Sequence, residues 1–154
     1  MYIISSNIGN SKSYDYNNNK PYYKYNDNDN DNDNDRDHHC FIINNKDGIL
    51  KLIDSCIDGY IRIWNFHSGK QINKIYAAND WLYGICLWND DYLFVGCFDK
   101  TIKLIELQTG KVIKTLSGHN DLVLTVKYIN HLKLGKCLIS HAWRNKKIKI
   151  WKIG

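Results

Sequence analysis

Three short stretches of the chain alternate apolar and polar residues with a period of two. The apolar pairs are Ile61/Ile63, Ile102/Leu104 and Ile148/Ile150, and the residues between them are Arg62, Lys103 and Lys149. Such alternation is typical of β-strands, whose successive side chains point to opposite faces. Gly and Asp recur too often to leave room for a helix of about 10 apolar-periodic residues. We therefore expect strands rather than helices.

These strands belong to a repeated unit. DGYIRIWNFHSGKQINKI begins at Asp58, DKTIKLIELQTGKVIKTL begins at Asp99, 41 residues later, and NKKIKIW begins at Asn145, after a further 46 residues. Apolar runs and turn residues around each copy predict a four-stranded antiparallel meander. One such sheet cannot bury both of its faces, so the units must stack on one another. The predicted fold is all-β, a partial propeller of three blades.

The repeats resemble the WD-repeat family over about residues 41 to 153. The best copy reads LSGHNDLVLTVKY from Leu116, in which Gly118-His119 is similar to the family's Gly-His. Trp64 and Trp151 match the Trp of the dipeptide that names the family, although Asn65 and Lys152 replace its Asp. The resemblance implies a β-propeller built of four-stranded blades. Because closed propellers have four to eight blades, three cannot close alone.

The resemblance also implies a buried polar set within each blade, made of a His, a hydroxyl residue, the hairpin Asp and the Trp. The residues that match this set are Asp58, Trp64, Asp99, His119, Asn145 and Trp151. No copy is complete. Asn145 replaces the Asp of the third copy, and Ile105 replaces the Trp of the second, which leaves Asp99 as a turn-former only. We expect apolar stacking to hold the blades together.

Residues 1 to 40 form a separate segment of low complexity, before a propeller segment over residues 41 to 154. The segment carries seven Asp against three Lys and one Arg, a net charge of −3. Its Asn, Asp, Tyr and Lys residues offer too little apolar surface to offset the entropy of ordering, which predicts disorder. An EF-hand reading from Asp27 fails, because Asn32 replaces the turn Gly and His38 the final Glu. MYIIS at the start could still supply the strand that the last blade lacks.

Nothing in the sequence indicates an enzyme, a cofactor or a metal site. Ser117, His119 and Asp121 lie close together, but the resemblance gives His119 a structural role. Gly110-Lys111 lacks the other residues of a phosphate-binding loop. The five Cys residues include no C-x-x-C pair and are better explained as buried apolar residues. No apolar run is long enough to span a membrane, and no signal peptide is recognisable, so a cytoplasmic location is expected.

The remaining hypothesis is a noncatalytic scaffold that binds other proteins. The resemblance implies that partners dock on the face that carries the hairpin turns and the entry to each innermost strand. Five residues are expected there: Ile57, Trp81, Phe98, Trp143 and Arg144. Exposed aromatic residues and Arg are the types that carry most interface energy. For the two Trp residues, packing between blades is the alternative.

Three further interpretations stay open. The chain could be an incomplete propeller fragment without independent activity, or it could associate with itself to cover its open end blades. Residues 41 to 154 carry a net charge of +8, which raises nucleic-acid binding as a third possibility. The residues that could bind phosphate groups form one cluster in the sequence: Arg144, Lys146, Lys147, Lys149 and Lys152. The other basic residues are spread over outward strand positions, so a nucleic-acid role is not favoured.

Overall fold

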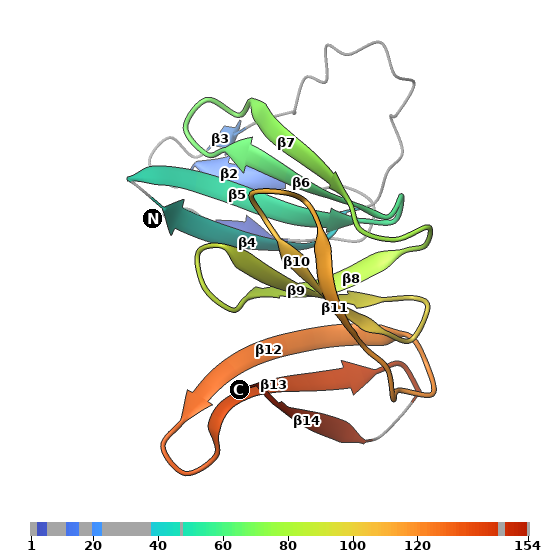
Figure 1. The fold of residues 1–154 in the computed structure, drawn as a ribbon. Helices are drawn as coiled ribbons and strands as arrows, with labels where there is room; N and C mark the ends of the chain where they lie inside the picture. Colours follow the sequence, from blue (N-terminus) through green and yellow to red (C-terminus); the bar gives the residue numbers. More distant parts are fainter. Residues whose placement is uncertain are drawn as a thin grey trace.

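A computed structural model describes residues 3–5, 12–15, 20–22, 38–46, 48–144 and 147–153 of the chain. All of its regular elements are strands within these ranges. Three antiparallel sheets follow one another along the sequence and stack in that order (Figure 1). The all-β prediction is therefore confirmed. Among the described residues, no helix has the length and apolar character needed to cross a membrane.

Each sheet is a meander in which neighbouring strands of the sequence pair. The first blade is formed by β4 (His38–Lys46), β5 (Ile49–Cys56), β6 (Tyr60–Asn65) and β7 (Gln71–Tyr76). The second is formed by β8 (Leu82–Leu87), β9 (Tyr92–Cys97), β10 (Ile102–Glu106) and β11 (Val112–Leu116). The third is formed by β12 (Val123–His131), β13 (Gly135–Ala142) and β14 (Ile148–Lys152).

A fourth, small sheet lies in the predicted tail. It pairs β1 (Ile3–Ser5) with β2 (Lys12–Asp15), and β2 with β3 (Lys20–Tyr22). The residues of MYIIS that the structure describes thus pair within this sheet and not with the third blade. Strand β4 begins at His38, three residues before the predicted boundary. Residues 1–2, 6–11, 16–19 and 23–37 lie outside the described residues, so disorder there stays a prediction.

The strand registers confirm that the three repeats are structurally equivalent. Ile61 pairs with Ser55, Ile102 with Gly96, and Ile148 with His141, so the three isoleucines occupy the same place in their sheets. The equivalences used below follow from these registers.

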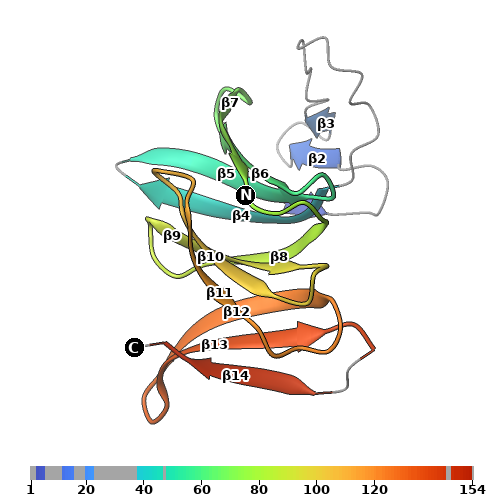
Figure 2. The same cartoon turned by 45° about the vertical axis from the view of Figure 1, so that its right-hand side comes forward.

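The core lies between the sheets. The apolar cluster between the first two blades contains Ile53, Ile61, Ile63, Ile85 and Val95, among others. The cluster between the second and third contains Phe94, Ile102, Leu104, Val126 and Leu138, among others. Figure 2 shows the same order of sheets from a second direction, and the first strand of the second blade, β8, contacts both β4 and β12.

Close backbone approach fixes the spacing of the blades. A Cβ added to Gly96 would lie 2.5 Å from the carbonyl oxygen of Val123 in the next blade, and one added to Gly84 would lie 2.6 Å from that of Leu124. In the first blade Ser55 stands at the position of Gly96, and its hydroxyl donates to the carbonyl oxygen of Tyr83. The interface between blades therefore admits only small side chains at this point.

Candidate protein-binding face

One side of the stack gathers the turns between the second and third strands of every blade. These turns are β5–β6, β9–β10 and β13–β14, and the loops that enter β8 and β12 reach the same side (Figure 1). We call this side the turn face. Its turns contain all five residues predicted to bind partners. Trp81, Phe98 and Trp143 are 47%, 42% and 49% exposed, Arg144 is exposed, and Ile57 is half-buried.

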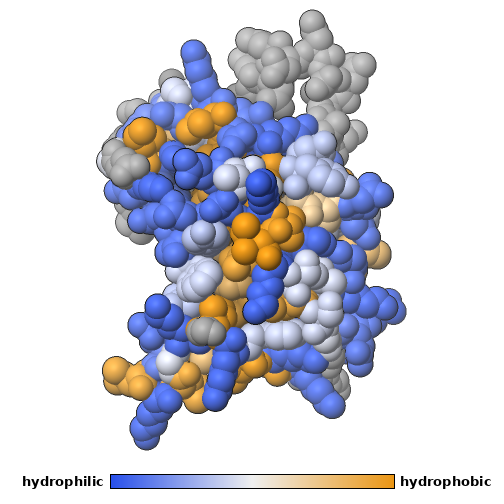
Figure 3. Space-filling view, viewed as in Figure 1, coloured by the Kyte–Doolittle hydropathy of each residue, from blue (hydrophilic) through white to orange (hydrophobic). Residues whose placement is uncertain are grey.

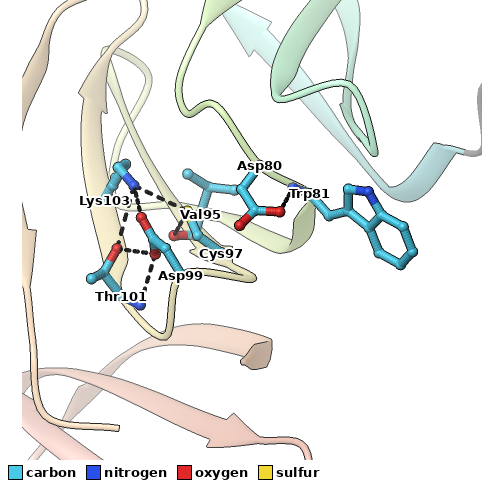
Figure 4. A network of polar contacts seen from close by, with 7 residues as sticks. All are labelled: Asp80, Trp81, Val95, Cys97, Asp99, Thr101 and Lys103. Atoms are coloured by element: carbon cyan, nitrogen blue, oxygen red, sulfur yellow. Dashed lines mark hydrogen bonds and ion pairs between the residues drawn. The ribbon is translucent and has the colours of Figure 1, made fainter. Parts of the chain in front are cut away.

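Trp81 and Phe98 form an aromatic pair on this face. Their ring centroids are 5.6 Å apart, and the ring of Tyr83 lies 6.5 Å from that of Trp81. Trp81 precedes β8, and Phe98 follows β9. The amide of Phe98 donates to the carbonyl of Trp81 at 2.9 Å, and the carboxylate of Asp80 accepts the amide of Trp81 at 2.9 Å (Figure 4). Hydrogen bonds thus fix the main chain that carries both rings, while each residue stays about half exposed.

Trp143 occupies the corresponding place in the third blade. Its amide donates to the carbonyl of Leu122 at 2.8 Å, as Phe98 does to Trp81. The repeat spacing counted back from Ile148 would put Arg144 at the position of Phe98, but the β13–β14 turn is one residue longer than the β9–β10 turn. Arg144 adopts a positive φ of 49° within the turn.

An ion pair supports the β9–β10 turn below the aromatic pair. Asp99 accepts from the Nζ of Lys103 at 2.5 Å, from the Oγ1 of Thr101 at 2.6 Å and from its amide at 3.0 Å (Figure 4). Asp99 thus stabilises the turn, as predicted, and also forms an ion pair with Lys103 on β10. Lys100 in the same turn has a φ of 69°, a value that turn hydrogen bonds must stabilise.

The β5–β6 turn carries the equivalent pair in a more buried form. The Nη2 of Arg62 donates to the Oδ2 of Asp58 at 2.6 Å, and the two side chains are only 7% and 14% exposed. Burial by itself raises the pKa of Asp58, but hydrogen bonds from Arg62 and the Tyr60 amide outweigh it and hold that pKa below its ordinary value. The pKa of Asp99 is lowered in the same way, by Lys103 and Thr101 against the opposing effect of burial.

The third blade contains a hydrogen-bonded His, Ser and Trp set, in which the His and Ser are buried and the Trp is half-buried. The Nε2 of His119 and the indole Nε1 of Trp151 each lie 2.7 Å from the Oγ of Ser140. The hydroxyl accepts from the indole, so its proton is available to the imidazole. Burial lowers the pKa of His119, and the positive charges of Lys149 and His141 lower it further. Asn145, the fourth predicted member, lies outside the described residues.

In the first blade a carboxylate replaces the serine. The indole of Trp64 donates to Asp54, which occupies the position of Ser140 and is 1% exposed. In the second blade the same two positions hold Ile105 and Val95, both fully buried. Asp54 and Ser140 were not among the residues predicted from the sequence. Spacing is the signal that could have indicated them, since each lies two residues after the residue that pairs with the Trp.

The side chains that could suggest a catalytic site form hydrogen bonds within the fold. His119 contacts Ser140 rather than Ser117, and the carboxylate of Asp121 accepts the amide of Leu122 at 2.8 Å. Burial raises the pKa of Cys97 to about 12, although the Nζ of Lys103 lies 3.8 Å from its sulfur. Among the residues that the structure describes, no group of three His, Cys, Asp or Glu side chains could hold a metal ion.

Comparisons with known proteins agree with this architecture, although no family model matches the chain. The sequence is 27% identical over 70 residues to the U3 small nucleolar RNA-associated protein 21 homolog of Schizosaccharomyces pombe, covering 46% of this chain and 8% of that protein. It is 35% identical over 88 residues to the WD repeat domain-containing protein 83 homolog of Dictyostelium discoideum, covering 56% of this chain and 24% of that protein. The chain thus spans less than a quarter of each relative's length.

A solved structure gives the same result for the fold. The WD40 β-propeller domain of Doa1 matches with a TM-score of 0.62 and 21% identity, over 75% of this chain and 36% of that one. The predicted resemblance is confirmed, because the relatives of this chain are WD-repeat proteins and its fold is that of the WD40 β-propeller domains.

Proposed function

We propose that this chain is a noncatalytic scaffold that binds other proteins through the turn face. The observation that carries the proposal is the aromatic pair of Trp81 and Phe98, which stays about half exposed although the adjacent residues Leu82 and Cys97 are fully buried. Exposed aromatic side chains on a rigid support are the residue types that supply most interface energy, at about 2 kcal/mol or more for a single hot spot.

The surroundings of the pair favour protein binding over other roles. The main chain of both residues is held by hydrogen bonds and the two rings contact each other, so a partner would have less to order on binding. The neighbouring carboxylate and ammonium groups of Asp99 and Lys103 are paired with each other, which leaves a polar rim around an apolar centre. That arrangement is typical of protein interfaces.

Affinity capture with tagged protein tests the proposal. The variants Trp81→Ala, Phe98→Ala and Arg144→Ala are compared with the intact chain, and Ile113→Ala is the control. Ile113 is 52% exposed on β11, away from the turn face. We expect Trp81→Ala and Phe98→Ala to reduce capture of the same proteins at least tenfold, while Ile113→Ala captures as the intact chain does. Equal capture by all four variants would rule out the turn face as the binding surface.

The state of assembly and the location are part of the proposal. Self-association would cover apolar surface on the end blades, and a cytoplasmic setting suits the free thiols of Cys56, Cys86, Cys97 and Cys137. Size-exclusion chromatography with light scattering separates a defined species from the soluble aggregate expected of an incomplete fragment. Imaging of the tagged full-length protein tests the location.

Nucleic-acid binding is the second candidate, supported by the basic cluster and by the RNA association in the name of one relative. Against it, one member of the cluster is engaged, since the Nζ of Lys149 donates to the carbonyl oxygen of Gly118. Titration with single-stranded RNA at two salt concentrations decides the matter, because phosphate contacts weaken steeply as salt rises.

A further inference from the structure

The net positive charge of the propeller segment comes from its third blade. The 33 residues from Leu122 to Gly154 contain seven Lys, one Arg and no Asp or Glu. Residues 41 to 121, over the first two blades and the loop that follows them, contain nine basic and nine acidic residues. The whole net charge of +8 over residues 41 to 154 therefore belongs to the third blade, which attracts anionic surfaces.

The β12–β13 hairpin of this blade extends beyond the corresponding hairpin of the second blade. The last cross-strand pair of β8 and β9 is Leu87 with Leu93, and its equivalent in the third blade is Tyr128 with Leu138. Three further pairs follow in the third blade, which at the usual rise of a strand carry the hairpin about 10 Å farther. We call its end, residues 130–136, the hairpin tip. It lies at the opposite end of the strands from the turn face (Figure 1).

The hairpin tip carries two exposed leucines among basic residues. All seven residues of the tip are exposed, Leu132 completely and Leu134 by 49%. Both leucines lie in the turn between β12 and β13, and not on the outer face of the sheet. Lys133 lies between them and Lys136 follows, and within the described part of the chain neither lysine forms an ion pair. Figure 3 shows hydrophobic side chains beside hydrophilic ones at the lower left of the molecule, where Figure 1 places the end of this hairpin.

Hydrogen bonds and a glycine fix the conformation of the tip. The Nδ1 of His131 accepts the amide of Lys133 at 3.2 Å and that of Leu134 at 3.3 Å. The thiol of Cys137 donates to the carbonyl oxygen of Leu134 at 3.5 Å. Gly135 has a φ of 72°, a conformation that glycine adopts without strain. The exposure of the leucines is therefore a property of an ordered turn.

The shape and chemistry of the tip favour a lipid bilayer over a nucleic acid or a folded protein. A bilayer interface accepts a convex apolar point, because side chains can pass between the headgroups to the acyl chains. Anionic headgroups also attract nearby lysines. A nucleic acid would pair with the lysines but leave the leucines in water, and the tip has no Phe, Tyr or Trp on which bases could stack. A folded protein would need a matching apolar pocket lined by carboxylates.

We propose that the hairpin tip binds membrane surfaces that contain anionic lipids. Leu132 and Leu134 insert below the headgroups, while Lys133 and Lys136 pair with the anionic groups above them. The leucines and the lysines act together, because a short apolar anchor alone gives only marginal membrane binding. The proposal goes beyond the proposed function, since it holds whether or not the turn face binds a protein.

Co-sedimentation of the full-length chain with lipid vesicles tests the proposal. Vesicles of phosphatidylcholine alone are compared with vesicles of phosphatidylcholine and phosphatidylserine in equal parts. We expect at least tenfold tighter binding to the vesicles that contain phosphatidylserine. Leu132→Ser with Leu134→Ser should weaken this binding at least tenfold, because it removes the inserted side chains. Lys133→Gln with Lys136→Gln should weaken it at least fivefold, because it removes the charges that face the headgroups.

Two variants of the second blade are matched controls. Lys100→Gln with Lys114→Gln removes the same number of exposed charges away from the tip. Ile113→Ser changes an apolar residue that is 52% exposed on β11. Both controls should bind vesicles as the intact chain does. Circular dichroism should show unchanged strand content in every variant, because all of the substituted residues are exposed.

Four results would overturn the proposal. The first is equal binding to the two kinds of vesicle, or binding to neither. The second is vesicle binding that survives the loss of both leucines, and the third is an equal loss in the two-lysine control, since the overall charge would then explain the attraction. The fourth is binding of single-stranded RNA, but not of vesicles, that Lys133→Gln with Lys136→Gln weakens. Phe98→Ala separates the tip from the turn face, because it should leave vesicle binding intact even if it abolishes capture of partners.

Discussion

Trp64 donates its indole N–H to the carboxylate of Asp54, on the neighbouring strand of the same blade. Asp54 lies two residues after Leu52, the cross-strand partner of Trp64, and both members of the pair are buried. In the second blade Val95 and Ile105 fill the same two positions without any polar atom in their side chains. The pair is therefore replaced as a unit, which leaves neither a buried donor nor a buried acceptor alone.

Asp54→Val should lower the free energy of unfolding by about 1–3 kcal/mol, because it leaves the Trp64 indole buried without this acceptor. Adding Trp64→Ile should cost less than the sum of the two single changes, since the double variant reproduces the pair of the second blade. Urea denaturation of the four proteins measures both effects. Additive losses would show that the two positions are not coupled.

His119 predicts a dependence of stability on pH. Burial and two nearby cations lower its pKa in the folded protein, while the unfolded chain has an ordinary His pKa of about 6.5. The unfolded state then binds more protons between the two pKa values, so the free energy of unfolding should fall as pH drops below about 6.5. Urea midpoints at pH 7.5, 6.5 and 5.5 test this. His119→Gln should flatten the profile in this range, and an unchanged slope would contradict the assignment.

The ion pairs Asp58–Arg62 and Asp99–Lys103 should contribute differently to the stability of the protein. Asp58→Asn should destabilise the protein by about 1–3 kcal/mol, because it leaves the buried guanidinium of Arg62 without its charged partner. Asp99→Asn should cost less than about 1 kcal/mol, since 38% of the Asp99 side chain is exposed and water screens its pairing with Lys103. Both carboxyl groups have a lowered pKa in the folded state, so these contributions should disappear as pH falls below about 4. Thermal unfolding of both variants at pH 7 and pH 3 makes the comparison, and equal losses would refute it.

Gly96 predicts a strict steric limit between the second and third blades. Gly96→Ala adds a Cβ that would lie 2.5 Å from the Val123 carbonyl oxygen, so the blades must separate, at a cost of about 1–3 kcal/mol. Ser140→Ala, a change within the third blade, is a useful comparison because it should leave the blade spacing unchanged. Hydrogen exchange should show faster exchange in both β9 and β12 for Gly96→Ala alone. Exchange in β9 and β12 as slow as in the wild-type protein would show that the interface accommodates the added Cβ without loss of stability.

The repeat and its strand positions could be predicted from the sequence because they depend on spacing. Ile61, Ile102 and Ile148 recur with the same neighbours, and the period of two assigns each to a strand face. The turns followed from Asp58-Gly59 and Asp99-Lys100 for the same reason. These features are local, so a single sequence contains them in full.

The partners of polar side chains could not be predicted as well, because they depend on register across strands. Asp58 matches the family's hairpin Asp in sequence, yet it forms an ion pair with Arg62. The acceptor of the Trp64 indole is Asp54 instead. The repeat spacing would align Arg144 with Phe98. Because the β13–β14 turn has one extra residue, Trp143 occupies the position of Phe98 instead.

The exchange of Asp54 and Trp64 for Val95 and Ile105 has a consequence for how such chains are recognised. A blade can lose the very residues by which its kind is usually identified and still keep its shape, provided that both change together. Descriptions of this architecture that weigh each position separately will then overlook blades like the second. Those that follow coupled positions should find more of them, including in chains where only isolated tryptophans remain.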